Sequence, residues 1–429
     1  MQNQPQDVLD FKLQHWLFNE IDQLPINQQI QLKSIRRCCT SPIEFKGELP
    51  AVYLLSNGQS AKFFGQKTCK NPWACPVCTA RMMNEYRSVI ATMLDMLRDK
   101  KFAGDDYFAY GLTLTIPHLA FMRCKETTDI LYNTWKYFTM KNFNRSHGHA
   151  FHQFNLDVKH FWHVRVAEYT YGENGWHPHF HCIFWIKRSD AHKVLAYQKK
   201  LNAFWTQCAK KYTLKYWLEH DLHKNINEDR SALCDKLYSK ISQKYPALKF
   251  STNSDGTLLE CLSSDYITGW GSDKELTGNI RKQASHEGHY TVYQIMLKAQ
   301  EDSKYRDIFI DYILDVTRKP VHHRVRRSPG LTKLIKQYRQ LNGYKKVSEQ
   351  KKTEDWRIIL FFDKEQWSLL CSKNKTSPVL SNILYLAIKD EDLLFEYLDY
   401  LECSCFLPNK ASPLINAIEN LFNDTSAAG

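Results

Sequence analysis

Histidines at alternating positions are the residues of this chain whose types and spacing best suit chemistry. Residues 176–185 read WHPHFHCIFW, and their aromatic and β-branched content predicts a strand. Alternate side chains of a strand point to one face, so we expect His179 and His181 to lie side by side, with Phe180 on the opposite face. Two imidazoles together on one face of a sheet are typical of half a site for a divalent metal ion.

A glutamate on the preceding segment is expected to complete this metal site. Residues 163–170 (HVRVAEYT) also predict a strand, and the five residues that follow them (YGENG) are typical of a turn. A hairpin with its tip at 173–174 places Glu168 opposite His179, and a tip one residue later places it opposite His181. A loop with an odd number of residues turns Glu168 to the other face. The three side chains then form a mixed nitrogen and oxygen site with open positions, the alternative being a histidine-rich hairpin without chemical function.

The histidine motif resembles the core of a known enzyme superfamily. The sequence HFH at 179–181 is a histidine–hydrophobic–histidine motif, which resembles that of the HUH endonucleases. The longer pattern, Glu168-x-Thr170 followed by GWHPHFH at 175–181, resembles the plasmid rolling-circle replication initiator proteins. The resemblance implies an α+β fold, with an HUH-type antiparallel sheet and flanking helices. It also implies that the glutamate and the two histidines bind Mg²⁺ or Mn²⁺.

A second strand fits the same family. Residues 107–118 (YFAYGLTLTIPH) predict a strand that is ended by Pro117. Its Leu-Thr-Leu-Thr is common in core strands, but ahead of a His-x-His strand it resembles the first motif of HUH initiators. In that family the motif is the strand beside the metal strand. His118 could then approach the metal site, although a surface or capping position is more usual for such a histidine.

Tyr266 is the tyrosine that best resembles the nucleophile of the family. It precedes the sequence ELTG at 275–278, as in the third motif of the initiators. Many relatives carry a lysine three residues after this tyrosine, but here that position is Gly269. The phosphate contact of that lysine is therefore expected from Lys274, or is absent. A half-buried tyrosine with a structural role is the alternative.

Cysteines in the N-terminal part have the spacing of a structural zinc site. Cys75-Pro-Val-Cys78 turns two thiolates toward one ion, and Cys69 can supply a third. Cys38 or Cys39 can be the fourth ligand, and we take Cys39 as that ligand. The initiator family carries a similar cluster ahead of its first catalytic motif. A redox pair is the alternative, although nothing here resembles a thioredoxin-like unit.

The composition favours a nucleic-acid partner and a reducing compartment. The 429 residues carry a formal charge of +12, which favours a polyanion without proving one. Arg324, Arg326 and Arg327 lie in a basic run that suits phosphate contacts, with a solvated loop as the alternative. The 13 cysteines without a signal-peptide pattern indicate the cytoplasm. We expect no membrane partner, because no apolar run reaches the roughly 18–20 residues of a membrane span.

Changes in composition along the chain divide it into four expected regions. Residues 1–100 are a helical and Cys-rich region that binds zinc, and residues 101–335 are the HUH endonuclease domain. Residues 336–355 are polar and rich in lysine, as in a linker, and residues 356–429 are a small helical C-terminal region.

The resemblance implies an enzyme that nicks and rejoins one DNA strand at a specific sequence in a plasmid origin. Tyr266 attacks the scissile phosphate to give a 5′-phosphotyrosine and a free 3′-OH that primes synthesis, and His177 acts as its base or as a supporting group. Origin DNA and the host helicase and polymerase are the expected partners. Three alternatives stay open: an HUH transposase, a zinc-containing DNA-binding protein without catalysis, and a metallohydrolase that uses a metal-bound water.

Overall fold

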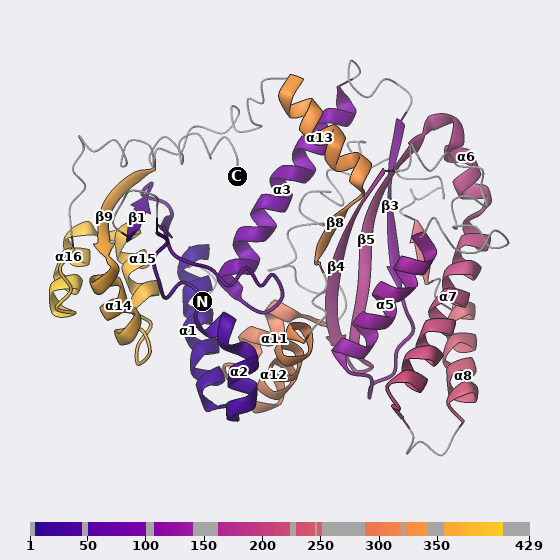
Figure 1. The fold of residues 1–429 in the computed structure, drawn as a ribbon, viewed down its shortest axis with the longest axis horizontal. Helices are drawn as coiled ribbons and strands as arrows, with labels where there is room; N and C mark the ends of the chain where they lie inside the picture. The colour runs from indigo at the N-terminus through magenta and orange to yellow at the C-terminus, as the bar shows by residue number, and fades with distance from the viewer. Residues whose placement is uncertain are drawn as a thin grey trace. The chain divides into compact units, whose positions relative to one another are not determined.

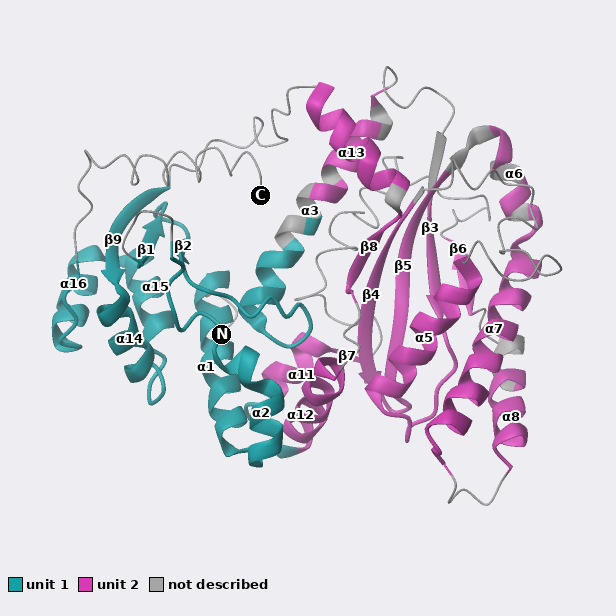
Figure 2. Ribbon diagram, in the orientation of Figure 1, with its two compact units in different colours: residues 1–88, 300–303, 345–429 teal, residues 89–299, 304–344 magenta. Residues whose placement is uncertain are grey.

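The computed structural model contains two units, which we describe one at a time (Figure 2). Unit 1 comprises Met1–Ser88, Gln300–Ser303 and Lys345–Gly429, and unit 2 comprises Val89–Ala299 and Lys304–Tyr344. The structure describes residues 5–44, 50–99, 107–139, 162–223, 229–244, 247–250, 288–318, 323–341 and 356–405. Within these ranges, no helix combines the length and the hydropathy that a membrane crossing requires.

Unit 2 is built on an antiparallel sheet in the order β6-β3-β5-β4-β7, with β8 also paired to β4. The apolar and β-branched segments that predicted strands form its centre. The strands are β3 (Tyr107–Thr115), β4 (Trp162–Gly172), β5 (Gly175–Lys187), β6 (Leu248–Phe250), β7 (Tyr290–Thr291) and β8 (Val325–Arg327). An antiparallel sheet combined with many helices is the α+β class that the sequence predicted.

A helical layer covers the face of this sheet that lies opposite the histidines. The alternation of β5 turns Phe180 to that face, where Tyr132 and Trp135 of α5 (Cys124–Thr139) pack on it with ring centroids 5.0 and 5.7 Å away. Helix α7 (Gln198–Glu219) packs on α5, and α8 (Arg230–Lys244) packs on α7 (Figure 1). Helix α3 (Pro76–Arg98) begins in unit 1 and continues into unit 2. The other helices along this part of the chain are α6 (Arg188–Ala196), α11 (Val292–Lys298), α12 (Ser303–Thr317) and α13 (Pro329–Leu341).

Unit 1 contains a smaller antiparallel sheet in the order β2-β1-β9. All six residues of its central strand, β1, are buried, as expected for a strand covered on both faces. Helix α1 packs on α15 beside this sheet. The elements are α1 (Gln6–Gln23), α2 (Ile26–Arg36), β1 (Ala51–Ser56), β2 (Ala61–Phe64), β9 (Arg357–Asp363), α14 (Lys364–Lys373), α15 (Val379–Lys389) and α16 (Glu391–Tyr400).

The C-terminal region, predicted as a small helical region, contains helices α14, α15 and α16 and also adds a strand to this sheet. Its first element is β9, which pairs with β1 from Ala51↔Asp363 to Ser56↔Arg357. The side chain of Asp363 then accepts hydrogen bonds from two backbone N–H groups of the first turn of α14, which ends the strand and begins the helix. The first and last parts of the chain therefore build one unit, with the whole of unit 2 between them in sequence.

Candidate metal centre

The hairpin of β4 and β5 sets the register of the predicted metal ligands. The two strands are joined by a turn at 173–174, because Gly172 pairs with Gly175. Gly175 has a φ of +82°, a backbone conformation that favours glycine. From this tip, the pairing places Glu168 opposite His179. Of the two registers left open, the structure therefore has the one with the tip at 173–174.

The three predicted ligand side chains converge on one point. Oε2 of Glu168 lies 2.8 Å from Nε2 of His179 and 2.8 Å from Nε2 of His181, and the two nitrogens are 3.0 Å apart. The glutamate is 4% exposed and His181 is 7% exposed, so the group lies inside the protein surface. Carboxylate oxygen and imidazole nitrogen together are donors that divalent cations take.

The Nδ1 atoms of the two histidines also have partners, which orient the rings. Nδ1 of His179 donates to the backbone carbonyl of His177 (3.4 Å), and Nδ1 of His181 lies 3.4 Å from Oγ1 of Thr113. A neutral imidazole with its proton on Nδ1 presents a lone pair at Nε2. Without an ion, the same Nε2 atoms can donate to Oε2 of Glu168, so a divalent cation would take the place of these protons between the three side chains.

The electrostatics of Glu168 keep it ionised. Burial alone raises the pKa of this carboxyl group, because it disfavours the charged form. The hydrogen bonds and charges of His179 and His181 act in the opposite direction and prevail, so that its pKa lies well below the usual value. An ionised carboxylate is the form that binds a metal ion.

The threonines of β3 support the histidines of β5. Strand β3 pairs with β5 so that Thr115 is opposite His179 and Thr113 is opposite His181, so the Leu-Thr-Leu-Thr strand lies beside the strand of the two histidines, as predicted. The two hydroxyls are on the histidine face, and Oγ1 of Thr115 lies 3.1 Å from Nε2 of His177. The two leucines of the motif are buried on the other face. The supporting role of the threonines was not predicted, although their alternation was visible in the sequence.

A second group of histidines lies beside the candidate ligands. Nδ1 of His177 is 3.4 Å from Nδ1 of His118, and the rings are 4.8 Å apart. Of the two positions considered for His118, the structure has the one near the site: the residue is half-buried against His177. Burial is the main cause that lowers the pKa of both histidines, and His289 adds to the effect on each, so both are neutral at pH 7. The ring of His289 also borders Gly172, where a Cβ atom would lie 3.1 Å from it.

Four cysteines of unit 1 form a second candidate metal site. They are Cys38, Cys69, Cys75 and Cys78, whose sulfur atoms all lie within 4.8 Å of one another. Individual Sγ–Sγ distances are 3.4 Å for Cys38–Cys78, 3.5 Å for Cys69–Cys78 and 3.6 Å for Cys38–Cys75. Sulfurs of a tetrahedral zinc site with bonds of about 2.3 Å lie about 3.8 Å apart. The cluster is therefore close to the size that zinc requires.

The fourth cysteine of this group is Cys38, which corrects the choice of Cys39. The backbone of Cys39 has a φ of +65° and its N–H donates to the carbonyl of Lys67 (2.8 Å). The Sγ of Cys39 is 3.6 Å from that of Cys38 and is not part of the group of four. Adjacent residues of an irregular segment point in different directions, so only one of the two can face the ion.

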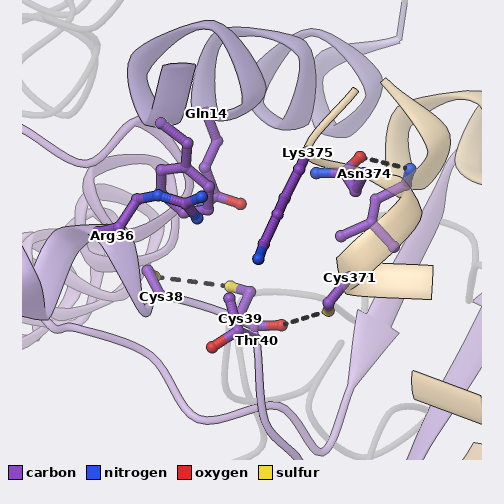
Figure 3. A pocket seen from close by; sticks show the side chains of 10 residues that line it. Gln14, Arg36, Cys38, Cys39, Thr40, Cys371, Asn374 and Lys375 are labelled. Carbon is purple, nitrogen blue, oxygen red and sulfur yellow. Dashed lines mark hydrogen bonds between the residues drawn. The ribbon is translucent and has the colours of Figure 1, made fainter. Parts of the chain in front are cut away.

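A small pocket borders Cys38 and Cys39 (Figure 3). Arg36 and Lys375 are among the side chains that line it, and Lys375 extends toward the two cysteines from just beyond α14. Arg36 is also paired with Asp22 at 2.6 Å. Positive side chains near a thiolate cluster offset its negative charge, so the C-terminal part of unit 1 contributes to the surroundings of the cysteine group.

Three of the four predicted DNA-binding residues lie close to the hairpin of β4 and β5. Arg326 and Arg327 lie on β8, which pairs with β4, the strand of Glu168. Arg324 lies just before β8, and its carbonyl accepts a hydrogen bond from the backbone N–H of Ala167 (2.8 Å). The three arginines are therefore on or directly before the strand that pairs with the hairpin. The predicted nucleophile and the predicted lysine, at positions 266 and 274, lie outside the described residues.

Comparisons with known proteins do not identify this chain. No family model, no curated protein and no solved structure gives a significant match. The two candidate metal-ligand groups, one of four cysteines and one of a glutamate and two histidines, are the features of the structure that bear on function.

Proposed function

We propose that this protein is a metal-dependent endonuclease that nicks and rejoins one DNA strand, and that it initiates rolling-circle replication of a plasmid. The observation that carries the proposal is the convergence of Glu168, His179 and His181 on adjacent strands of an antiparallel sheet. The neighbouring strand with its Leu-Thr-Leu-Thr sequence supports it, because the same strand order is expected of an HUH-type sheet. The basic charge of the chain supports a DNA substrate.

The reaction forms one bond to phosphorus and breaks another. The phenol oxygen of Tyr266 attacks the scissile phosphate, giving a 5′-phosphotyrosine and releasing the 3′ oxygen, which takes up a proton as a 3′-OH. Because the phosphotyrosine keeps the energy of the phosphodiester, the 3′-OH can reverse the step and rejoin the strand without ATP. A bound Mg²⁺ or Mn²⁺ supplies positive charge beside the phosphate. Glu168 and the two histidines hold and orient this charge.

His177 is better placed for support than for proton transfer in this reaction. Its Nε2 contacts the hydroxyl of Thr115 and its Nδ1 faces His118, so both ring nitrogens are directed at neighbouring side chains. Its backbone carbonyl accepts the hydrogen bond that orients His179. We therefore assign it to holding the ligand strand in place, which was one of the two roles predicted for it.

The remaining predicted groups have roles in binding. The cysteine group holds a structural Zn²⁺ that stabilises unit 1, and its four thiolates leave no open position for catalysis. Arg324, Arg326 and Arg327 contact phosphates of the origin DNA, together with Lys274. The host helicase and polymerase then act on the nicked strand and its free 3′-OH.

A covalent-adduct assay tests this function. Labelled single-stranded fragments covering the DNA around the protein's own gene are mixed with the full chain and Mn²⁺ and run on a denaturing gel, with the Tyr266→Phe and Tyr290→Phe variants in parallel. We expect a shifted covalent band that only Tyr266→Phe loses. Cutting without an attached protein would indicate a metal-bound water as nucleophile. Binding without cutting would indicate a DNA-binding protein without catalysis, and excision of a flanked element in cells would indicate a transposase.

A further inference from the structure

Aromatic rings and lysines gather on the outer side of the α5–α7 layer. Tyr137 of α5 lies between Phe204 and Tyr212 of α7, with ring centroids 6.4 and 5.7 Å away. All three rings are half-buried. Lys211 places its Nζ 5.5 Å from the centroid of Tyr137, and Lys215 places its Nζ 5.9 Å from that of Tyr212. We call these five residues the α5–α7 patch.

The spacing along α7 makes the patch a continuous strip. Phe204, Lys211 and Lys215 are separated by seven and four residues, so they lie on one side of the helix. Lys200, four residues before Phe204, continues the same side and lies 5.3 Å from the ring of Tyr197. Cationic side chains therefore alternate with aromatic rings over much of the length of α7.

The rings are not required to close the interior between the two helices. Beneath them, Phe138 of α5 and Trp205 of α7 are fully buried and pack edge to face, with centroids 5.2 Å apart. These two side chains already fill the interior between α5 and α7. Tyr137 and Tyr212 form an outer layer with part of each ring in water, and exposed rings flanked by lysines are typical of surfaces that bind nucleic acid.

The charge of the patch fits a polyanion. Lys200, Lys211 and Lys215 are all exposed. Lys215 forms an exposed ion pair with Glu219 at 3.5 Å, which is easily exchanged for another anion. A lysine above an aromatic ring can pair with a phosphate while the ring face receives a base. A protein partner of opposite charge would not need the rings to be interleaved with the lysines.

The patch is separate from the candidate metal centre. Helix α5 covers the face of the sheet that carries Phe180, whereas Glu168, His179 and His181 lie on the other face. A strand bound to the patch therefore cannot be the segment that lies at the metal ligands.

We propose that the α5–α7 patch binds single-stranded DNA. Bases stack on Tyr137, Phe204 and Tyr212, and the lysines of α7 contact the phosphates between them. Duplex DNA fits this surface less well, because its base faces are covered by their neighbours. The proposal rests on the proposed function only for the choice of DNA over RNA, since both have bases that can stack. In that function, the patch holds a strand that has been separated from its complement.

Binding of a strand without an origin tests this proposal independently of nicking. We would measure fluorescence anisotropy of labelled oligo(dT) of 20 nucleotides with the full chain. The Tyr137→Leu, Tyr212→Leu double variant keeps apolar side chains on the helices but removes the rings, and we expect at least about fivefold weaker binding for each ring. Tyr400→Leu, a change at an exposed tyrosine of α16, is the matched control and should bind as the wild type does.

The lysines give a second, quantitative readout. Each phosphate contact to a single strand contributes about 0.7 to the slope of log affinity against log salt. The Lys211→Gln, Lys215→Gln variant should therefore lower that slope by about 1.4, whereas Lys389→Gln on α15 should leave it unchanged. Thermal melts of all variants establish that they are folded. Cross-linking with 5-iododeoxyuridine should place adducts on Tyr137, Phe204 or Tyr212.

Three results would overturn the proposal. They are unchanged oligo(dT) affinity in the folded double tyrosine variant, equal competition by a duplex of the same length, and cross-links confined to other parts of the chain. Equal competition by oligo(U) would show that the patch binds single strands of both kinds, and would overturn the choice of DNA. A wild type that binds oligo(dT) through the patch but forms no covalent adduct at any origin fragment would refute the nicking function and leave the patch in place.

Discussion

Replacing Glu168 with glutamine tests whether the hairpin is a metal site. The change preserves the size and shape of the side chain and removes only its negative charge. In the structure, Oε2 of this residue is 2.8 Å from Nε2 of both His179 and His181, and the carboxyl group is ionised because the histidines hold its pKa well below the usual value. The candidate metal site therefore loses one full charge and keeps both imidazoles.

The expected loss of metal affinity follows from this charge. A carboxylate and a divalent cation at a usual bond length of about 2.1 Å attract each other by about 4 kcal/mol, even with the screening of bulk water. This free energy corresponds to a loss of affinity of about a thousandfold. Screening is weaker at a residue that is almost fully buried, so a thousandfold is the lower bound.

Titration calorimetry with Mn²⁺ on the full chain measures this affinity. Glu173→Gln is the matched control, because Glu173 is exposed at the tip of the same hairpin and should bind Mn²⁺ as the wild type does. A loss of less than tenfold for Glu168→Gln, with His179→Asn still abolishing binding, would refute the reasoning. It would show that the carboxylate orients the histidines and does not bind the ion.

Three further predictions concern unit 1. Cys38→Ser should lose the bound zinc, whereas Cys39→Ser should retain it, as measured by the metal content of the purified protein. Burial lowers the pKa of His15, and Asn19 donates to its Nε2 (3.3 Å), so the folded protein holds it neutral. As the pH falls, His15 is therefore protonated in the unfolded chain at a higher pH than in the folded protein. Its contribution to stability is complete above about pH 6.5, the usual pKa of histidine, and is lost as the pH falls below it. Urea denaturation at pH 5.5 and 7.5 should show a smaller difference for His15→Gln than for the wild type. Phe362→Ala should lower the free energy of unfolding by about 3–5 kcal/mol in thermal or urea denaturation, because the ring is fully buried in β9.

Local patterns allowed the hairpin to be predicted from the sequence in some detail. Alternation along a strand decides which side chains share a face, and a short turn leaves few possible registers. Glu168 and His179 were therefore placed opposite each other as one of two cases, and the structure has that case. The same alternation would have shown Thr113 and Thr115 on the histidine face, since they belong to the neighbouring strand.

Other features depend on contacts between distant parts of the chain. The choice between Cys38 and Cys39 depends on a hydrogen bond of the backbone to Lys67 and on a positive φ, neither of which has a signal in the sequence. The approach of His118 to His177 depends on how the segment after β3 turns. The pairing of β1 with β9 joins the two ends of the chain, and neither strand carries a pattern that names its partner.

The pairing of β1 with β9 also has a consequence for synthesis. About 300 residues separate the end of β1 from the start of β9, and ribosomes add roughly 5–20 residues each second. The emerging N-terminal strand therefore waits about 15 to 60 seconds with one edge uncovered, and during this time the whole of unit 2 leaves the ribosome. An unpaired edge of an apolar strand promotes aggregation. A nascent chain of this protein is thus a candidate client for chaperones until its final 85 residues arrive, and premature termination in that stretch yields a complete unit 2 attached to an unfinished sheet of unit 1.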